Sequence, residues 1–217
     1  MAIIPADEKV FMVDKRTNTT YGGSKALQDM QQWYTMQDVS DSIQPYKVFT
    51  ASLTQSGGDA TEYITSAAIA PFVIGVTYEI AINSGNADFT NIGAPNNNVD
   101  TRFIATGTTP NSWGDGGEVE IAYNTGAPVA PILKNTIGNV WFNYVDVGQY
   151  TINSDALFTD NKSQVYIPNS GALNGDILFI VTAPNNQNQT DIITYDSPTS
   201  QADNVLYQTP IEIRIYN

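Results

Sequence analysis

The chain has 217 residues and a formal net charge of −13, from 22 acidic and 9 basic residues, and it contains neither cysteine nor histidine. This composition argues against disulfide frameworks, zinc–thiolate sites and histidine-dependent catalysis, because each needs a side chain that the sequence lacks. The acidic balance also argues against binding to nucleic acid or insertion into a membrane surface, since anionic phosphates recruit lysine and arginine.

The first 45 residues are predicted to hold a strand-like run and one amphipathic helix. Residues 9–13 form a compact β-like run, and residues 17–23 are typical of a turn and loop. Ser24 is a suitable N-cap for a helix over about residues 24–43, which Pro45 ends.

One face of this helix is apolar, with residues at spacings of three and four. Trp, Tyr and Met are enriched in the cores of protein interfaces. We therefore expect a partner or oligomer interface formed by Phe11, Leu27, Met30, Trp33, Tyr34, Met36 and Val39. The alternative is that the helix packs on the sheet of the chain's own β region.

From residue 47 onward the apolar residues recur with a period of two, which is the period of a strand. The alternating segments are residues 48–53, 77–83, 101–106, 118–124, 139–145, 149–153, 163–167, 176–182 and 210–216. Short strands separated by Gly, Pro and Asn are typical of sandwiches and barrels. We predict a mainly β fold, in which a short N-terminal helical segment precedes a β-sandwich or jelly-roll-like domain.

Three segments between the predicted strands are rich in Gly, Asn and Gln: residues 91–99, 107–117 and 183–190. We expect them to be solvated connections. The alternative is that they are contact-making loops, which binding proteins often place on a rigid β scaffold.

The carboxylates give little support for an enzyme or a metal site. Asp115, Glu118 and Glu120 are the candidates for a pair of glycosidase carboxylates. However, Glu118 and Glu120 alternate within one predicted strand and are expected on its solvated face. The pairs Asp38/Asp41 and Asp115/Glu118 do not match a calcium-binding loop. We predict no catalytic residue, no metal and no cofactor.

Loop 107–117 also offers a candidate sugar contact. The indole of Trp113 could stack on a sugar ring while Asn111 and Asp115 bond its hydroxyls. The alternative, which we favour, is that the indole folds back over the neighbouring strands. Trp141 lies between Val140 and Phe142 and is predicted to be a core or interface residue.

Several segments resemble structural proteins of bacteriophage particles. Fibre-type virion proteins of tailed phages, particularly crAss-like phages of Bacteroides, are similar to MAIIPADEKVFMV at residues 1–13 and WYTMQDV at 33–39. A small β domain of phage structural proteins is similar to residues 46–60, 126–138, 147–151 and 158–162. A second phage module is similar to residues 61–125, through YEI at 78–80, DFTNIGA at 88–94 and FIATG at 103–107.

The resemblance implies a division into an attachment segment, a main β domain and an inserted β module: residues 1–45, residues 46–60 plus 126–217, and residues 61–125. It implies a structural, non-enzymatic protein of the virion surface, synthesised in the cytoplasm of a bacterial host. The expected role is a capsid head fibre or decoration protein, with a tail-associated receptor- or glycan-binding protein as the alternative. The expected partners are other virion proteins, a host surface glycan in the alternative role, and copies of the chain. We expect a homotrimer, with a dimer as the alternative, because fibres usually close by cyclic symmetry.

Overall fold

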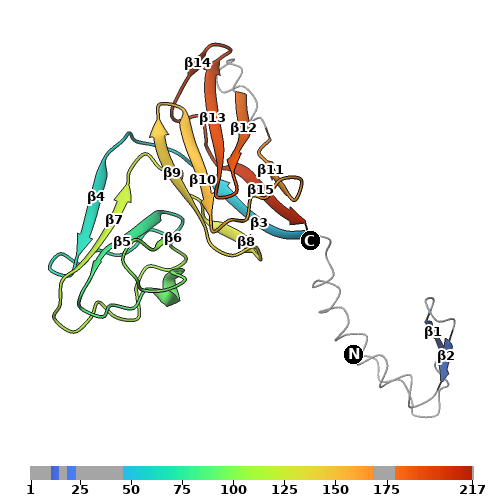
Figure 1. Cartoon of the computed structure of the whole chain (residues 1–217), viewed down its shortest axis with the longest axis horizontal. Coiled ribbons are helices and arrows are strands. Elements are labelled where there is room, and N and C mark those ends of the chain that lie inside the picture. The colour runs from blue at the N-terminus through green and yellow to red at the C-terminus, as the bar shows by residue number, and fades with distance from the viewer. Residues whose placement is uncertain (1–10, 15–18, 23–45, 169–178, 217) are drawn as a thin grey trace. The chain divides into compact units, whose positions relative to one another are not determined.

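A computed structural model of the chain describes residues 11–14, 19–22, 46–168 and 179–216 (Figure 1). By its internal contacts the chain divides into two units, Met1–Pro45 and Tyr46–Asn217. The two units are described separately below.

The described residues of the first unit form an antiparallel pair of strands, β1 (Phe11–Asp14) and β2 (Thr19–Gly22). Part of the β-like run predicted at residues 9–13 is therefore a strand. β2 lies where a turn and loop were predicted, and that prediction is wrong for Thr19–Gly22, because Thr and Tyr favour the strand conformation. The helix predicted over residues 24–43 lies outside the described residues.

Over residues 46–168 and 179–216 the second unit forms three antiparallel sheets, so the described chain is mainly β, as predicted. One sheet has the order β12-β13-β10-β9 with β14 paired to β13, another β11-β15-β3-β8, and the third β4-β7-β5-β6. The bounds of these strands are β3 (Tyr46–Leu53), β4 (Thr61–Thr65), β5 (Thr77–Asn83), β6 (Arg102–Ile104), β7 (Val119–Asn124), β8 (Ile132–Asn135), β9 (Val140–Asp146), β10 (Gln149–Ser154), β11 (Ser163–Tyr166), β12 (Phe179–Asn186), β13 (Gln189–Ser197), β14 (Ser200–Gln201) and β15 (Thr209–Tyr216).

The period of two in the sequence sets which side chains are buried. In β15, Ile211 and Ile213 are buried, while Glu212 and Arg214 between them are only partly covered. β15 pairs with β3 over its full length, from Thr209 opposite Leu53 to Tyr216 opposite Tyr46. The last strand of the chain therefore closes against the first strand of the second unit.

The sheets that contain β10 and β15 share one hydrophobic core. Its fully buried side chains come from both sheets and include Phe49, Leu53, Phe142, Ile152, Ile192 and Ile213. Burying a side chain of this size contributes about 1.5–3 kcal/mol. This shared core holds the two sheets face to face.

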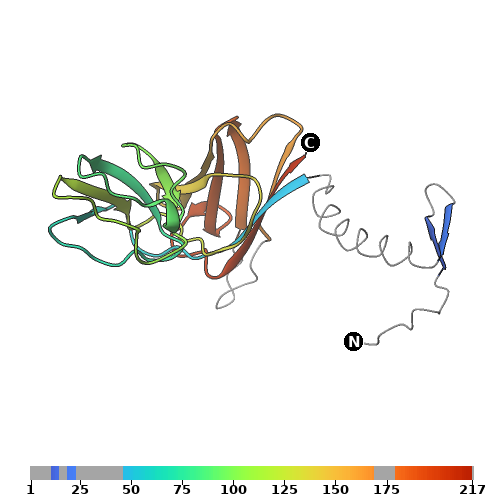
Figure 2. The ribbon, with the colours of Figure 1, turned by 90° about the horizontal axis from the view of Figure 1, so that it is seen from below.

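The third sheet has a separate, more aromatic core, formed around Phe72, Tyr78, Phe89 and Phe103. The rings of Phe72 and Tyr78 meet edge to face, with centroids 4.7 Å apart and planes at 73°. Figures 1 and 2 both show β4 to β7 gathered beside the other two sheets. All four strands of this sheet come from residues 61–124, a continuous stretch between β3 and β8.

The loop predicted over residues 183–190 is wrong. β12 continues to Asn186 and β13 begins at Gln189, so only two residues connect them. Asn186 Oδ1 accepts a hydrogen bond from Asn188 N at 2.8 Å, which closes this tight turn. β13 pairs with both β12 and β10 and is central in its sheet. The sequence did not predict β13 as a strand, because its buried positions include the polar residues Thr190 and Thr194 as well as Ile192.

The segment DFTNIGA forms a turn that packs against the end of β6. Asp88 Oδ1 accepts hydrogen bonds from Thr90 N at 3.0 Å and Thr90 Oγ1 at 2.7 Å, just before the short 3₁₀ helix Thr90–Ile92. Gly93 follows with φ +112°, and a Cβ there would lie 2.5 Å from the carbonyl oxygen of Ile104. Glycine is therefore required at this position both by φ and by space.

We expect Gly93→Ala to lower the free energy of unfolding by at least about 2 kcal/mol, because it combines an unfavourable φ with a backbone clash. Gly116→Ala is the matched control: Gly116 has φ +98°, but nothing lies within 4 Å of a Cβ built there. Urea unfolding of both variants measures the difference, which isolates the clash. Equal destabilisation would contradict the close packing of Gly93 against β6.

Candidate functional site

The third sheet is joined to the rest of the second unit by two connections that pair with each other. Thr54 and Val129 exchange backbone hydrogen bonds of 2.9 and 2.8 Å, and further along Thr125 N donates to the carbonyl of Ala60 at 2.8 Å. The segments on either side of residues 61–124 thus run antiparallel and bond to each other. A connection of this kind restrains both ends of the inserted stretch.

A second set of contacts lies where β5 and β6 approach the other two sheets. Ala130 N donates to the carbonyl of Gly75 at 2.7 Å, and Gly75 N donates to that of Ala105 at 2.8 Å. Gly75 has φ +91°, and a Cβ would lie 2.6 Å from Pro131 N. Ile104, on β6, is buried in the core shared by the other two sheets rather than in that of its own sheet.

β9 is the edge strand of its sheet, and the third sheet occupies part of its free edge. Phe142 N donates to Thr77 Oγ1 at 3.1 Å, and Asn139 Nδ2 donates to the carbonyl of Arg102 at 3.0 Å. Exposed strand edges are sites of unwanted pairing between proteins. Here two side chains bond to backbone groups across the gap, so the third sheet covers an edge of β9 without extending its sheet. We call this region the junction.

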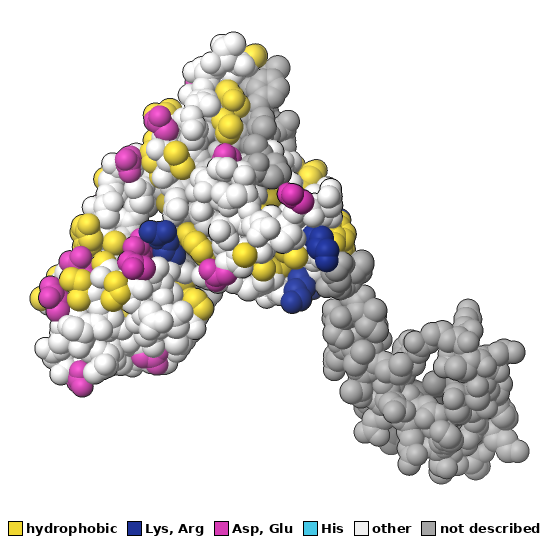
Figure 3. Space-filling model, viewed as in Figure 1, with side chains coloured by type: hydrophobic (Ala, Val, Ile, Leu, Met, Phe, Trp, Pro, Cys, Tyr) yellow, Lys and Arg dark blue, Asp and Glu magenta, His cyan; other side chains and the backbone are white. Residues whose placement is uncertain are grey.

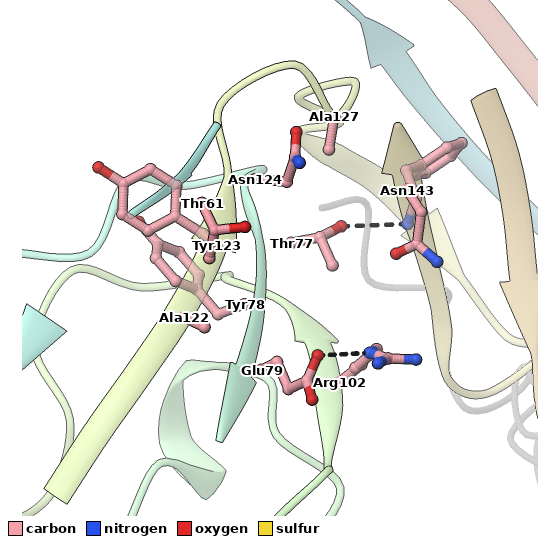
Figure 4. A pocket seen from close by; sticks show the side chains of 11 residues that line it. Thr61, Thr77, Tyr78, Glu79, Arg102, Ala122, Tyr123, Asn124, Ala127 and Asn143 are labelled. Atoms are coloured by element: carbon pink, nitrogen blue, oxygen red, sulfur yellow. Dashed lines mark hydrogen bonds and ion pairs between the residues drawn. The ribbon is translucent and has the colours of Figure 1, made fainter. Parts of the chain in front are cut away.

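One hollow of about 110 Å³ opens at the junction, between β5, β7 and β9 (Figure 4). Thr77 and the ion pair of Glu79 Oε2 with Arg102 Nε, at 2.8 Å, lie on its sides. The Tyr123 phenol also lines it and donates a hydrogen bond to Glu62. This hydrogen bond, followed by burial, raises the pKa of Tyr123 to about 12. That phenol stays protonated near neutral pH. This small space suits a few water molecules rather than a substrate.

A larger cleft of about 290 Å³ lies on another side of the junction. It is lined by the loop that precedes β6 and by residues on or beside β9 and β10, chiefly Asn98, Asp100, Arg102, Asn139, Trp141 and Asp155. We call it the Trp141 cleft. Arg102 lines both this cleft and the smaller hollow, and it is the only basic residue between Thr61 and Thr125.

Trp113 packs against the aromatic core of the third sheet. This agrees with the alternative favoured above, in which the indole folds back over the neighbouring strands. Its ring is stacked on Phe72, with centroids 5.6 Å apart and planes at 23°, and meets Phe89 edge to face at 5.7 Å. The side chain is half-buried. One face of the indole is therefore already covered by protein, which leaves less of it to stack on a sugar.

Asn111, a predicted sugar contact, is engaged within the fold. Its Nδ2 donates to Asp88 Oδ2 at 2.9 Å and its backbone N donates to Asn91 Oδ1 at 2.8 Å. Asp88 also accepts from Asn97 Nδ2 at 3.2 Å and from Thr90. These hydrogen bonds, those from Thr90 foremost, hold the pKa of the Asp88 carboxyl well below its usual range. The cluster fixes three loop segments to one carboxylate.

Asp115 is exposed and lies 3.5 Å from Asn86 Nδ2, and its backbone N donates to the carbonyl of Gly85 at 2.8 Å. Glu120 lies on β7 opposite Thr65 of β4 and is partly covered, whereas Glu118 is exposed. Among the described residues no group of three acidic side chains is placed to hold a metal ion.

Another polar cluster lies beside β9 and β10. Asp203 Oδ1 accepts from Tyr150 Oη at 2.7 Å and from Gly148 N at 2.8 Å, while Oδ2 accepts from Tyr144 Oη at 3.1 Å. Burial, followed by this hydrogen bond, raises the pKa of Tyr150. Three donors already converge on the carboxylate, so we interpret the cluster as a structural tie between β10 and the segment after β14.

The predicted helical interface cannot be located on the structure. Phe11 begins β1, whereas Leu27, Met30, Trp33, Tyr34, Met36 and Val39 lie outside the described residues. Trp141, predicted to be a core or interface residue, is half-buried on the face opposite Val140 and Phe142, which are in the core. The alternation of β9 could have indicated this orientation, but the sequence carried no signal for the loop that faces it.

Comparison of the chain with protein-family models, with curated proteins and with solved structures finds no match. Within the part of the chain that the structure describes, no helix is both long and apolar enough to cross a membrane.

We expect Thr77→Val to destabilise the second unit by about 1–3 kcal/mol, because it removes the acceptor of the buried Phe142 N–H while keeping the side chain's shape. Thr77→Ser retains the oxygen and is the control. Urea unfolding and hydrogen exchange at the Phe142 amide are the measurements. If the valine and serine variants behave alike, the hydroxyl does not cap the edge of β9.

Proposed function

We propose that the protein is a non-enzymatic structural component of a bacteriophage particle, a head fibre or capsid decoration protein. Residues 1–45 attach it to other virion proteins, and residues 46–217 form the displayed part. The proposal rests first on the resemblance of its segments to phage virion proteins.

The structural observation that supports this division is the placement of β3 within the second unit. The segment 1–45 has its own internal contacts, and among the described strands β1 and β2 pair only with each other. The chain enters the second unit at Tyr46, whose ring lies 5.5 Å from that of Tyr216. The connection to the insertion leaves beyond Leu53, at the other end of this eight-residue strand. At about 3.4 Å per residue, β3 separates the two connections by roughly 25 Å.

The finer architecture belongs to the same proposal: residues 46–60 and 126–217 form a β-sandwich domain, and residues 61–125 are a module inserted into one of its loops. Two separate cores and the paired connections support it. Insertion into a loop adds little loop-closure entropy when both ends of the insert already lie close together.

We propose self-association as a homotrimer through an apolar loop of the insertion, residues 67–74. Apart from Phe72 this loop is exposed, with Ile69 60%, Val73 57% and Ile74 47% accessible. Residues 63–78 contain no charged side chain, although acidic side chains are scattered over the face of the described residues that Figure 3 shows. Copies that carry a charge of −13 repel one another least where the surface is uncharged.

Deletion of residues 1–45 is expected to leave a folded β protein that no longer joins phage particles, because the attachment segment is gone. Circular dichroism reports the fold, and co-sedimentation with particles reports attachment. Full-length protein carrying Tyr63→Ala, at an exposed position of β4, is the control and should attach normally. Normal attachment of the deletion variant would overturn the assigned role of residues 1–45. Immunogold labelling of intact particles distinguishes head attachment from the alternative, a tail-associated receptor-binding protein.

The double substitution Ile69→Asp with Val73→Asp is expected to weaken self-association about tenfold or more, since it places charges in an apolar contact. Light scattering coupled to size-exclusion chromatography over a concentration series measures the oligomer. The matched control is Leu133→Asp with Tyr166→Asp, which adds the same charge at exposed positions on β8 and β11. Unchanged association of the first variant, or equal loss in both, would contradict the assignment of the apolar loop.

A further inference from the structure

The Trp141 cleft has the chemical character of a small-ligand site. Its volume of about 290 Å³ is close to the lower end of the roughly 300–1,000 Å³ typical of such sites. Its walls combine one indole with amide, carboxylate and guanidinium groups, from Trp141, Asn98, Asn139, Asp100, Asp155 and Arg102. These groups come from two separate parts of the second unit, the loop before β6 and the sandwich.

The loop is held in place by the first two of its three consecutive asparagines. Asn96 Oδ1 accepts from Asn98 N at 2.9 Å and from Thr101 Oγ1 at 2.6 Å. Asn97 Oδ1 accepts from Phe89 N at 2.9 Å, and its Nδ2 donates to Asp88. These bonds fix the backbone on both sides of Asn98. A loop that is ordered before binding loses less conformational entropy when a ligand arrives.

The side chain of the third asparagine, Asn98, does not hold the loop. The Asn98 side chain is exposed and, among the described residues, makes no hydrogen bond; the same is true of the carboxylates of Asp100 and Asp155. The segment that carries Asn98 and Asp100 is tied to β5 at both ends, since Asn83 Nδ2 donates to the carbonyl of Asn97 at 3.0 Å and Asp100 N to that of Ile80 at 2.8 Å. Rigid backbone therefore presents unoccupied polar groups to the cleft.

Trp141 supplies an independent observation. Its Nε1 is the one buried side-chain nitrogen or oxygen that has no hydrogen-bond partner among the described residues. Buried indole N–H groups usually have an acceptor. Trp141, which lines the cleft, therefore carries a donor that the described part of the fold leaves without a partner.

We propose that the Trp141 cleft binds a neutral saccharide unit. Asn98 would donate to and accept from its hydroxyls, Asp100 and Asp155 would accept from them, and the indole would contact the apolar face of the ring. The cleft favours a neutral sugar over an acidic one, because it holds two carboxylates while the Nε of its single guanidinium is paired with Glu79. This binding goes beyond the structural role proposed above and does not depend on where the protein is mounted.

Saturation-transfer NMR on the full-length protein tests the proposal, with glucose, galactose, mannose and N-acetylglucosamine as neutral probes and glucuronic acid as the charged one. We expect saturation transfer to at least one neutral sugar and a lower response for glucuronic acid. Asn98→Ala is expected to weaken that binding about tenfold, the size of one or two lost hydrogen bonds. Trp141→Phe should weaken it as well. Because Asn98 is exposed, its variant tests the site even if the tryptophan variant folds poorly.

The controls are Asn143→Ala, which lies on β9 but lines the smaller hollow, and Trp113→Phe, in the loop first considered for sugar contact. Both should bind as the unaltered protein does. Failure of every neutral sugar to bind, binding retained in Asn98→Ala, or a preference for glucuronic acid would each overturn the proposal. Incorporation of Asn98→Ala into particles is measured in parallel, so loss of sugar binding is distinguished from loss of attachment.

Discussion

The hydrogen-bonded junction between the third sheet and the edge of β9 is the constraint on which the rest of the second unit depends. The paired connections at Thr54 and Val129, together with Gly75 against Ala130, fix where residues 61–124 begin and end relative to the other two sheets. The side chain of Ile104, from β6, is buried in the core of those two sheets. One set of contacts thereby covers a strand edge and creates the two hollows that share Arg102.

Polar residues in this protein serve mainly to hold loops in place. Asp88 gathers bonds from Thr90, Asn97 and Asn111, so three loop segments depend on one carboxylate. A fold with short strands and long connections must satisfy many backbone groups outside its sheets, and Asn, Asp and Thr side chains can do so locally. A polar side chain that takes no part in holding a loop is therefore informative. Asn98 follows two asparagines whose side chains accept hydrogen bonds within the fold, and its own amide is left for another molecule.

The sequence predicted strands well where one face of the strand is apolar. The bounds predicted for β5, residues 77–83, agree with the structure, and those for β10 and β15 differ by one residue. Prediction failed where burial does not follow hydrophobicity. β13 buries threonines and starts in an Asn/Gln-rich segment, and β8 is exposed over three of its four residues. Neither strand shows the alternation of apolar and polar residues on which a period-based prediction relies.

The candidate site was less accessible to sequence reasoning than the fold. The sequence alone determined the acidic charge, the absence of histidine and cysteine, and the alternation of apolar residues; the alternation was enough to predict a mainly β protein. Which of two tryptophans is available to a ligand was decided only by tertiary structure. Trp113 stacks on Phe72, from a distant part of the chain, whereas Trp141 faces a loop some forty residues earlier. Local sequence cannot report such pairings, because the packing of separate segments, and not the loop's own composition, decides which side chains remain uncovered.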